Sequence, residues 1–192
     1  MLSARFLRRL LVASLVLISV AGPVQAAGKN YQRSIVKYTM PDVVLVNQNG
    51  TKVRFRRLIE TDKTVVVDFI YGTCTTICPV LSAGFANLQR KLGADSRKIH
   101  LISISIDPEH DTPQVMNEYL KNFRARPGWD FLSGSREDID RVMKAFDAYF
   151  PTKMSHRPLD FIKAPSSSVW VRLDGLMGTG DLMSEMKKAG AL

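Results

Sequence analysis

The fold is decided by residues 64–79, TVVVDFIYGTCTTICP. This stretch opens with a β-branched and aromatic run that ends at Tyr71 and is short enough for a buried strand. Cys74 and Cys78 follow, and Pro79 suits the first turn of a helix. We therefore predict a buried strand, a reactive turn and a helix in direct succession.

Downstream of this stretch, helical and strand patterns alternate. The helix after Pro79 is predicted from apolar residues that recur at helical spacing, namely Leu81, Phe85, Leu88 and Leu92. Buried strands are predicted over 100–106 and 169–173, and Thr112 and Ser135 have the character of N-caps of the helices between them. The alternation indicates an α/β protein with parallel crossovers.

Upstream, the pattern indicates an N-terminal β-hairpin. Residues 43–46 and 52–55 favour strands, and the Asn49–Gly50 step between them is a hairpin signal. The predicted fold is thus a central mixed sheet flanked by helices, with this hairpin at its start. In open α/β sheets, sites gather at the carboxyl ends of strands, which is where the cysteine turn is expected.

The N-terminus has the layout of a secretory signal. Three arginines precede an apolar run over 10–22, and small residues at Val24 and Ala26 suit a signal peptidase. An uncleaved anchor is the alternative, but a bilayer span needs about 20 apolar residues and Pro23 interrupts this run too early. We therefore expect the signal peptide to be cleaved after Ala26 and the protein to be periplasmic or otherwise exported. Membrane anchoring is the less favoured alternative.

Three parts of the chain are therefore expected. Residues 1–26 form the cleavable signal peptide, 27–40 a loosely ordered lead-in, and 41–192 one domain of ordinary size. The formal net charge is +9, but the basic residues are scattered and no basic run is interleaved with aromatics. Nucleic acid is not an expected partner, whereas an acidic protein or an anionic membrane surface would suit this charge.

The chain has two cysteines, Cys74 and Cys78, only four residues apart. A disulfide between them closes a tiny loop and removes little chain entropy, so the pair is not a structural staple. If residues 75–78 form the first helical turn, the Cβ atoms lie about 5–6 Å apart, near the distance that a disulfide needs.

The two cysteines can also bind a soft metal ion. Structural zinc needs four ligands, whereas two thiolates with one imidazole suit copper.

Two motifs resemble the SCO/SenC family of copper-handling proteins. FIYGTCTTICP at 69–79 is similar to the family's metal-binding turn, and SIDPEHDTP at 105–113 is similar to its Asp-Pro-Glu-x-Asp-Thr-Pro element. His156 stands where the family keeps its single histidine ligand. The resemblance implies a thioredoxin-like fold that binds copper through Cys74, Cys78 and His156.

The resemblance also implies a partner and a role. Family members commonly help to build the copper centre of cytochrome c oxidase, as metallochaperones or as reductants of the target's cysteines. The expected partner is therefore an exported or membrane-bound cuproprotein such as cytochrome c oxidase, with a thiol reductant as a second partner. The sequence departs from the family at 75–77, which is Thr-Thr-Ile in place of Pro-Asp-Val, and around His156, which lies in Met-Ser-His-Arg in place of Asp-His-Ser.

Asp68 keeps a second function open. It is an acid inside an apolar strand, six residues before Cys74, as in thioredoxins, where such a residue moves the proton of the inner cysteine. Burying a carboxylate is costly unless it has a task or a satisfied partner. The alternatives are a proton relay, with the redox-active disulfide Cys74–Cys78, and an acid hydrogen-bonded to backbone at the strand end.

Two hypotheses follow from these residues. In one, the protein is a copper metallochaperone and not an enzyme; in the other, it is a thiol-disulfide oxidoreductase that reduces an exported metalloprotein. A peroxidase is excluded, because the proline that peroxiredoxins need before the reactive cysteine is Val67 or Tyr71 here. His100 is interpreted as a packing or hydrogen-bonding residue and His110 as an exposed loop residue. Met154 is the methionine placed to act as an auxiliary soft ligand.

Overall fold

The structure, a computed structural model, describes residues 30–192. The expected signal peptide, residues 1–26, lies outside the described residues. Within residues 30–192, no helix is long and apolar enough to cross a membrane.

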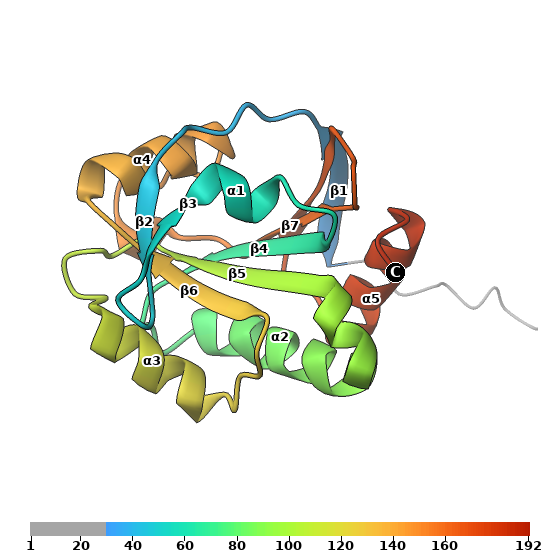
Figure 1. Ribbon diagram of the computed structural model, residues 1–192, viewed down its shortest axis with the longest axis horizontal. Helices are drawn as coiled ribbons and strands as arrows, with labels where there is room; N and C mark the ends of the chain where they lie inside the picture. Colours follow the sequence, from blue (N-terminus) through green and yellow to red (C-terminus); the bar gives the residue numbers. More distant parts are fainter. Residues whose placement is uncertain (1–29) are drawn as a thin grey trace, which may run out of the picture.

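A single mixed sheet forms the centre of the molecule, with strand order β1-β8-β7-β4-β5-β6-β2-β3 (Figure 1). The strands are β1 (Tyr31–Val36), β2 (Val44–Asn47), β3 (Lys52–Arg54), β4 (Thr64–Ile70), β5 (Ile99–Ser105), β6 (Trp129–Ser133), β7 (Leu159–Lys163) and β8 (Trp170–Gly175). The three central strands β4, β5 and β6 are parallel, and the other pairings are antiparallel. All seven residues of β4 are buried, as its apolar run predicts.

Helices cover both faces of the sheet. They are α1 (Phe55–Ile59), α2 (Cys78–Leu92), α3 (Pro113–Asn122), α4 (Arg136–Ala145) and α5 (Thr179–Lys188), with 3-10 turns η1 (Gly93–Lys98) and η2 (Lys153–Ser155). Figure 1 shows α2 and α3 on one face and α1 and α4 on the other, and α5 packs beside α2. The predicted N-caps are confirmed: the side chain of Thr112 accepts the amide of Val115, and that of Ser135 accepts the amide of Asp138.

The fold-class prediction is confirmed, including the mixed sheet, the flanking helices and the hairpin. In this hairpin, Val44 of β2 lies opposite Arg54 of β3. Residues 27–40 were expected to form a loosely ordered lead-in, but within them Tyr31–Val36 forms β1, an edge strand paired with β8. Its side chains are mostly exposed, so it lacks the alternating apolar pattern by which strands are recognised.

A second strand that the sequence patterns do not predict, β7, lies between His156 and β8. Its first four residues are buried, although the acid Asp160 interrupts the apolar run. The strand pairs with β4 on one side and β8 on the other. Because β7 is antiparallel to β4, the residues just before β7 lie at the edge of the sheet where β4 ends.

Candidate metal and redox centre

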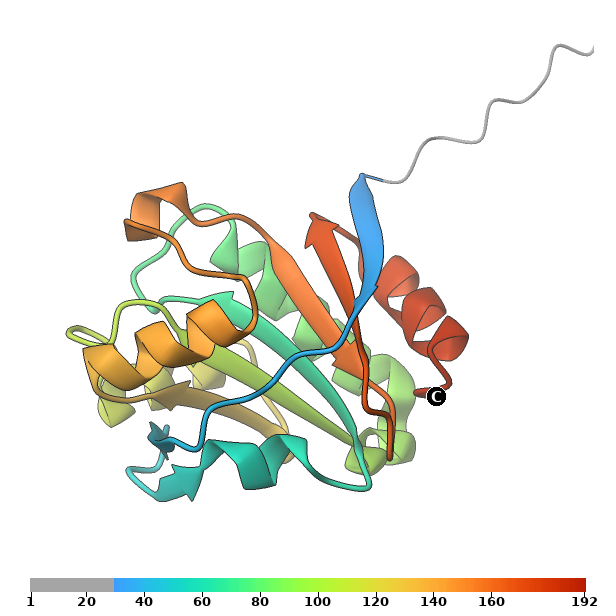
Figure 2. The same ribbon diagram turned by 90° about the horizontal axis from the view of Figure 1, so that it is seen from above.

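Three loops meet at this edge of the sheet. The cysteine turn follows β4, the Asp-Pro-Glu loop follows β5, and the segment with η2 and His156 precedes β7. Figure 2 shows the orange η2 segment beside the green loop that joins β4 to α2. The topology therefore brings together the sulfur-bearing and imidazole-bearing parts that the sequence analysis singled out.

Cys74 lies in the turn before α2, and α2 begins at Cys78. The expectation that residues 75–78 form the first helical turn is wrong, since Pro79 has no amide to bond the carbonyl of Thr75 and close that turn. Cys74 nevertheless contacts the start of the helix, because the backbone amide of Cys78 donates a hydrogen bond to Sγ of Cys74 at 3.4 Å. The hydroxyl of Thr76 lies 3.7 Å from the same sulfur. Both thiols are free, and both cysteines are buried.

The two thiols have opposite pKa shifts. Burial by itself raises the pKa of Cys74, but hydrogen bonds from Cys78 and Thr76 outweigh it and lower the pKa to about 7. The pKa of Cys78 is raised by its burial and by its hydrogen bond with Cys74. Cys74 is therefore the thiol of the pair that ionises near neutral pH and serves as the nucleophile, whereas Cys78 keeps its proton.

His156 follows η2 and packs against two aromatic rings. Its ring centroid is 6.4 Å from that of Tyr71 and 5.2 Å from that of Phe150, both in edge-to-face contact. Both ring nitrogens are buried, and the ring interacts with the backbone of Phe69 but forms no hydrogen bond of good geometry. Burial also lowers the pKa of His156, so the imidazole is neutral at physiological pH, the form that binds metal.

The structure places His156 near the cysteine turn through Tyr71, which accepts the amide of Cys74 on its carbonyl at 3.2 Å. Within residues 30–192, however, no three His, Cys, Asp or Glu side chains are gathered closely enough to hold a metal ion as they stand. The three residues named from the sequence thus share one edge of the sheet, where the imidazole packs against the ring of Tyr71.

Asp68 lies in the middle of β4, directly opposite Asp160 of β7. Both residues are buried, and neither carboxylate oxygen of Asp68 has a hydrogen-bond partner at good distance and angle. The pKa of Asp68 is raised by burial and then by Asp160, and burial raises the pKa of Asp160 to about 7. The charge of Asp68 also contributes to the raised pKa of Cys78. Hydrogen bonds from the side chain of Ser103 and from the backbone at Asp68 act in the opposite direction and lower the pKa of Asp68, so both the proton relay and the backbone-bonded acid stay open.

Asp160 is the residue that sequence reasoning missed. It sits four positions after His156, within a short apolar run that the sequence patterns do not identify as a strand. The same signal that identified Asp68, an acid among buried apolar residues, would have identified it once β7 was recognised. The pair forms a buried diacid behind Cys78.

The remaining candidates have simpler roles. Nε2 of His100 lies 2.7 Å from Oδ2 of Asp130, which confirms it as a hydrogen-bonding residue. His110 is exposed, as predicted, with its Nδ1 2.9 Å from Oδ1 of Asp107. Met154 is exposed at the tip of η2.

Comparison with known proteins gives one family. The family model described as SCO1/SenC matches residues 33–188. The SCO1 protein homolog of Bacillus subtilis is 29% identical over 177 residues, which cover 87% of this chain and 91% of that protein. A putative copper-binding protein of Stutzerimonas stutzeri is 31% identical over 112 residues, covering 58% of this chain and 53% of the relative.

Solved structures agree with the sequence relatives. BsSco, described as a member of the Sco family of cytochrome c oxidase assembly proteins with a disulfide switch, superimposes with a TM-score of 0.67 at 28% identity, over 83% of this chain and 97% of BsSco. Copper-bound ScoI of Bradyrhizobium japonicum superimposes with a TM-score of 0.59 at 26% identity, over 76% of this chain and 96% of ScoI.

Proposed function

Because the chain belongs to the SCO1/SenC family, we propose that it is an exported copper-binding assembly factor that takes up copper at Cys74, Cys78 and His156 and delivers it to a cuproprotein such as cytochrome c oxidase. Copper is the cargo in this proposal. The fold is the thioredoxin-like fold of the family, and the domain that carries the site follows a signal peptide cleaved after residue 26.

The observation that carries the proposal is the donor set at the end of β4. A thiolate with a pKa of about 7 and a second thiol meet at a helix start, and a neutral imidazole with two unbonded nitrogens lies on the neighbouring loop. Buried polar atoms without well-formed hydrogen bonds are costly, so an imidazole of this kind at the same edge of the sheet as two thiols is well suited to receive a soft ion. Two sulfurs and one nitrogen fit copper in either oxidation state.

Each ligand has a distinct part in uptake. Cys74 meets the ion first, because it is the thiolate at neutral pH. Cys78 must lose its proton as the ion binds, so copper binding releases protons and strengthens with rising pH. His156 completes the set only after its ring has moved toward the sulfurs, because within residues 30–192 the side chains are not gathered for metal binding as they stand.

The relatives support the choice of metal and target. One relative is named a putative copper-binding protein, and copper-bound structures exist for ScoI of Bradyrhizobium japonicum and of Arabidopsis thaliana. BsSco is described as belonging to a family of cytochrome c oxidase assembly proteins. An exported or membrane-bound cuproprotein is therefore the partner that we propose.

Titration of the fully reduced protein with Cu(I) tests this function. We expect one copper ion per chain, with tight binding abolished in Cys74→Ser and in Cys78→Ser. His156→Ala should weaken copper retention and change the Cu(II) spectrum while disulfide formation stays near that of the wild type. Equal copper affinity in the wild type and Cys74→Ser would overturn the proposal, and His100→Ala is the control histidine variant.

A second function, thiol-disulfide oxidoreductase, is favoured by the diacid behind Cys78. In this reaction the Cys74 thiolate attacks a partner disulfide, forming a mixed disulfide and releasing one partner thiolate. Cys78 then gives its proton to the Asp68 carboxylate and attacks Sγ of Cys74, which releases the second partner thiolate. The protein is left as the Cys74–Cys78 disulfide, oxidised by the two electrons that the partner gained.

The Asp68→Asn variant separates the two functions. If the carboxylate accepts the Cys78 proton, this variant should reduce a partner disulfide more slowly than the wild type near neutral pH, with copper affinity unchanged. Exchange rates measured from pH 6 to 9 give the comparison. Superimposable pH profiles would remove the proton relay and leave copper delivery as the function.

A further inference from the structure

The Asp-Pro-Glu loop contains two buried aspartates that the proposed function does not use. Asp107 and Asp111 lie one helical turn apart, and the amide of Asp111 donates to the carbonyl of Asp107 at 3.0 Å. Each carboxylate reaches a different neighbouring loop. The loop therefore lies between the thiol-bearing and the imidazole-bearing segments and is bonded to both.

Asp111 is bonded to the thiol side. The amide of Gly72, two residues before Cys74, donates to Oδ1 of Asp111 at 3.0 Å, and the hydroxyl of Ser105 donates to the other oxygen. The approach is close: a Cβ atom added to Gly72 would lie 2.7 Å from Oδ1 of Asp111. Glycine at this position lets the backbone of the cysteine turn rest directly on the carboxylate.

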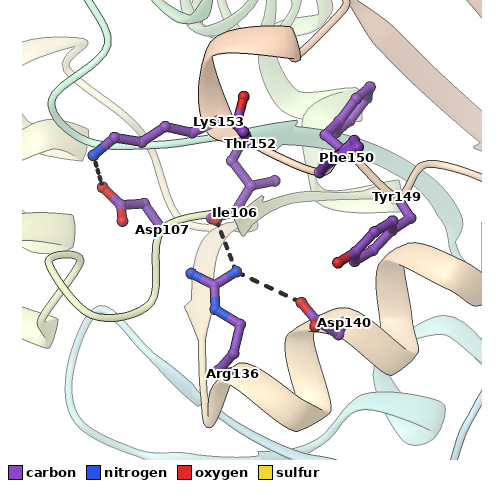
Figure 3. A pocket seen from close by; sticks show the side chains of 9 residues that line it. Ile106, Asp107, Arg136, Asp140, Tyr149, Phe150, Thr152 and Lys153 are labelled. Carbon is purple, nitrogen blue, oxygen red and sulfur yellow. Dashed lines mark hydrogen bonds and ion pairs between the residues drawn. The ribbon is translucent and has the colours of Figure 1, made fainter.

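Asp107 is bonded to the imidazole side. Nζ of Lys153, the first residue of η2, donates to Oδ2 of Asp107 at 2.6 Å, while Nδ1 of His110 lies 2.9 Å from Oδ1. The Asp107 side chain is only 6% exposed. Figure 3 shows Lys153 reaching across to Asp107 at the edge of a pocket of about 280 Å³. The same ammonium group lies 5.5 Å from the centre of the Tyr71 ring, against which His156 packs.

These contacts matter because the imidazole has no hydrogen bond of good geometry and interacts otherwise only with the backbone of Phe69. Its place depends on aromatic packing and on how the segment 150–157 is held. Two ion pairs bracket His156: Lys153–Asp107 three residues before it, and Arg157–Asp174, at 3.4 Å and more exposed, one residue after it. A short ion pair to a buried carboxylate is worth more than a long exposed one, so the Lys153 contact dominates.

We propose that Lys153, Asp107 and Asp111 are positioning residues that hold the His156 segment and the cysteine turn together across the Asp-Pro-Glu loop. Asp111 fixes the backbone ahead of the thiols, and Asp107 with Lys153 keeps the imidazole within reach of them. The inference deepens the proposed function, since it assumes that His156 serves as a ligand, but the ion pair and its effect on His156 can be measured without copper.

The first test uses metal-free protein and the acylation of histidine by diethyl pyrocarbonate, followed residue by residue by mass spectrometry. In Lys153→Met we expect His156 to react several-fold faster than in the wild type, with His100 unchanged as the internal control. Lys153→Arg keeps the ion pair and should restore the slow rate. Arg157→Gln, which removes the exposed pair on the other flank, is the matched control and should leave the rate near that of the wild type.

The second test measures copper retention in the same variants. Removing a residue that orients a ligand typically costs about tenfold or more in metal affinity, so Cu(II) should leave Lys153→Met about tenfold faster, with rescue in Lys153→Arg. Wild-type acylation of His156 in Lys153→Met, or an equal acceleration in Arg157→Gln, would overturn the inference. If His156→Ala retains copper as the wild type does, the proposed ligand fails, and the acylation result still reports on the ion pair.

If the Lys153→Met variant does not fold, the wild-type protein itself allows the role of the ion pair to be tested. The Lys153 side chain is 36% exposed, so its ion pair is open to screening by salt. In the wild type, raising the salt concentration to about 1 M should accelerate His156 acylation while His100 stays constant. A salt-independent rate would contradict the role of the ion pair.

Discussion

The two thiols lie four residues apart but in different surroundings. Cys74 faces the amide of Cys78 and the hydroxyl of Thr76, donors that favour the thiolate, whereas Cys78 is enclosed by the core and lies near the charge of Asp68. The difference arises from the place where α2 begins. If both cysteines lay within the helix, neither sulfur would receive the free amide at the helix start.

We expect the alkylation of the reduced protein to reveal this difference. The rate at Cys74 should rise with pH with a midpoint of about 7, and Cys78 should react only in more alkaline solution. Thr76→Val removes a donor that stabilises the thiolate, so the Cys74 midpoint should rise. Thr75→Val, at the exposed neighbouring position, is the matched control. Iodoacetamide rates followed by mass spectrometry give the midpoints, and equal midpoints for the two thiols would contradict this account.

At the scale of single residues, the sequence is enough to select Cys74, Cys78 and His156 as candidate site residues. Residue type and spacing identified the cysteines, and the resemblance to the family identified the histidine. Asp160 could not be found in the same way, because its significance depends on its register opposite Asp68. Which residue lies across a strand pair is set by the pairing of distant segments, and local patterns do not contain it.

Among the elements, β4, α2, β5, α3 and α4 follow from apolar periodicity and capping residues. Both missed strands have other reasons for forming. β1 is an edge strand with few buried side chains, and β7 is short and carries an acid. Each is stabilised by pairing with β8, so both depend on tertiary contacts that local propensity does not report.

The contact between the cysteine turn and the loop after β5 gives a prediction for these elements. In Gly72→Ala, the new Cβ would lie 2.7 Å from Asp111 Oδ1 and 3.0 Å from a methyl group of Val115, so the two loops must separate. We expect a loss of about 1–3 kcal/mol in the free energy of unfolding.

The matched control for Gly72→Ala is Gly84→Ala within α2, where an added Cβ meets nothing within 4 Å. Because alanine favours helix over glycine, this change should stabilise the protein by roughly 0.5–1 kcal/mol. Urea unfolding of both variants gives the comparison. A neutral or stabilising effect of Gly72→Ala would show that the two loops are not in close contact.

In the molecule as a whole, one mixed sheet carries three distant segments to the same edge. The parallel strands β4 and β5 end there, and the antiparallel strand β7 begins there. This topology brings together thiols, carboxylates and an imidazole from three segments that are far apart in sequence. It also buries Asp68 and Asp160 opposite each other on the neighbouring strands β4 and β7. Because ionising a buried carboxyl group is unfavourable, this burial lowers the stability of the folded state by an amount that depends on pH.

The sign of that pH dependence follows from the raised pKa of Asp160. Its pKa is about 7 in the folded protein and about 3.9 in an unfolded chain. Between these values the unfolded chain has already lost a proton that the folded protein still holds, so stability falls as the pH rises from about 4 to about 7 and then levels off. Asparagine cannot ionise. Asp160→Asn should therefore remove this decline, by up to about 1.4 kcal/mol per pH unit, and be more stable than the wild type at neutral pH.

Asp130 provides a control of opposite sign. Burial alone would raise its pKa, but the contact with His100 outweighs burial and lowers it, so its carboxylate stabilises the folded state above the unfolded pKa. Asp130→Asn should be less stable than the wild type at neutral pH, and the difference should shrink on acidification. Urea unfolding from pH 2 to 8 measures both variants, because the Asp130 difference is lost only as the pH falls below the unfolded pKa of about 3.9. Parallel curves for the wild type and Asp160→Asn would mean that Asp160 ionises in the folded protein as easily as in water, and that no proton is held behind Cys78.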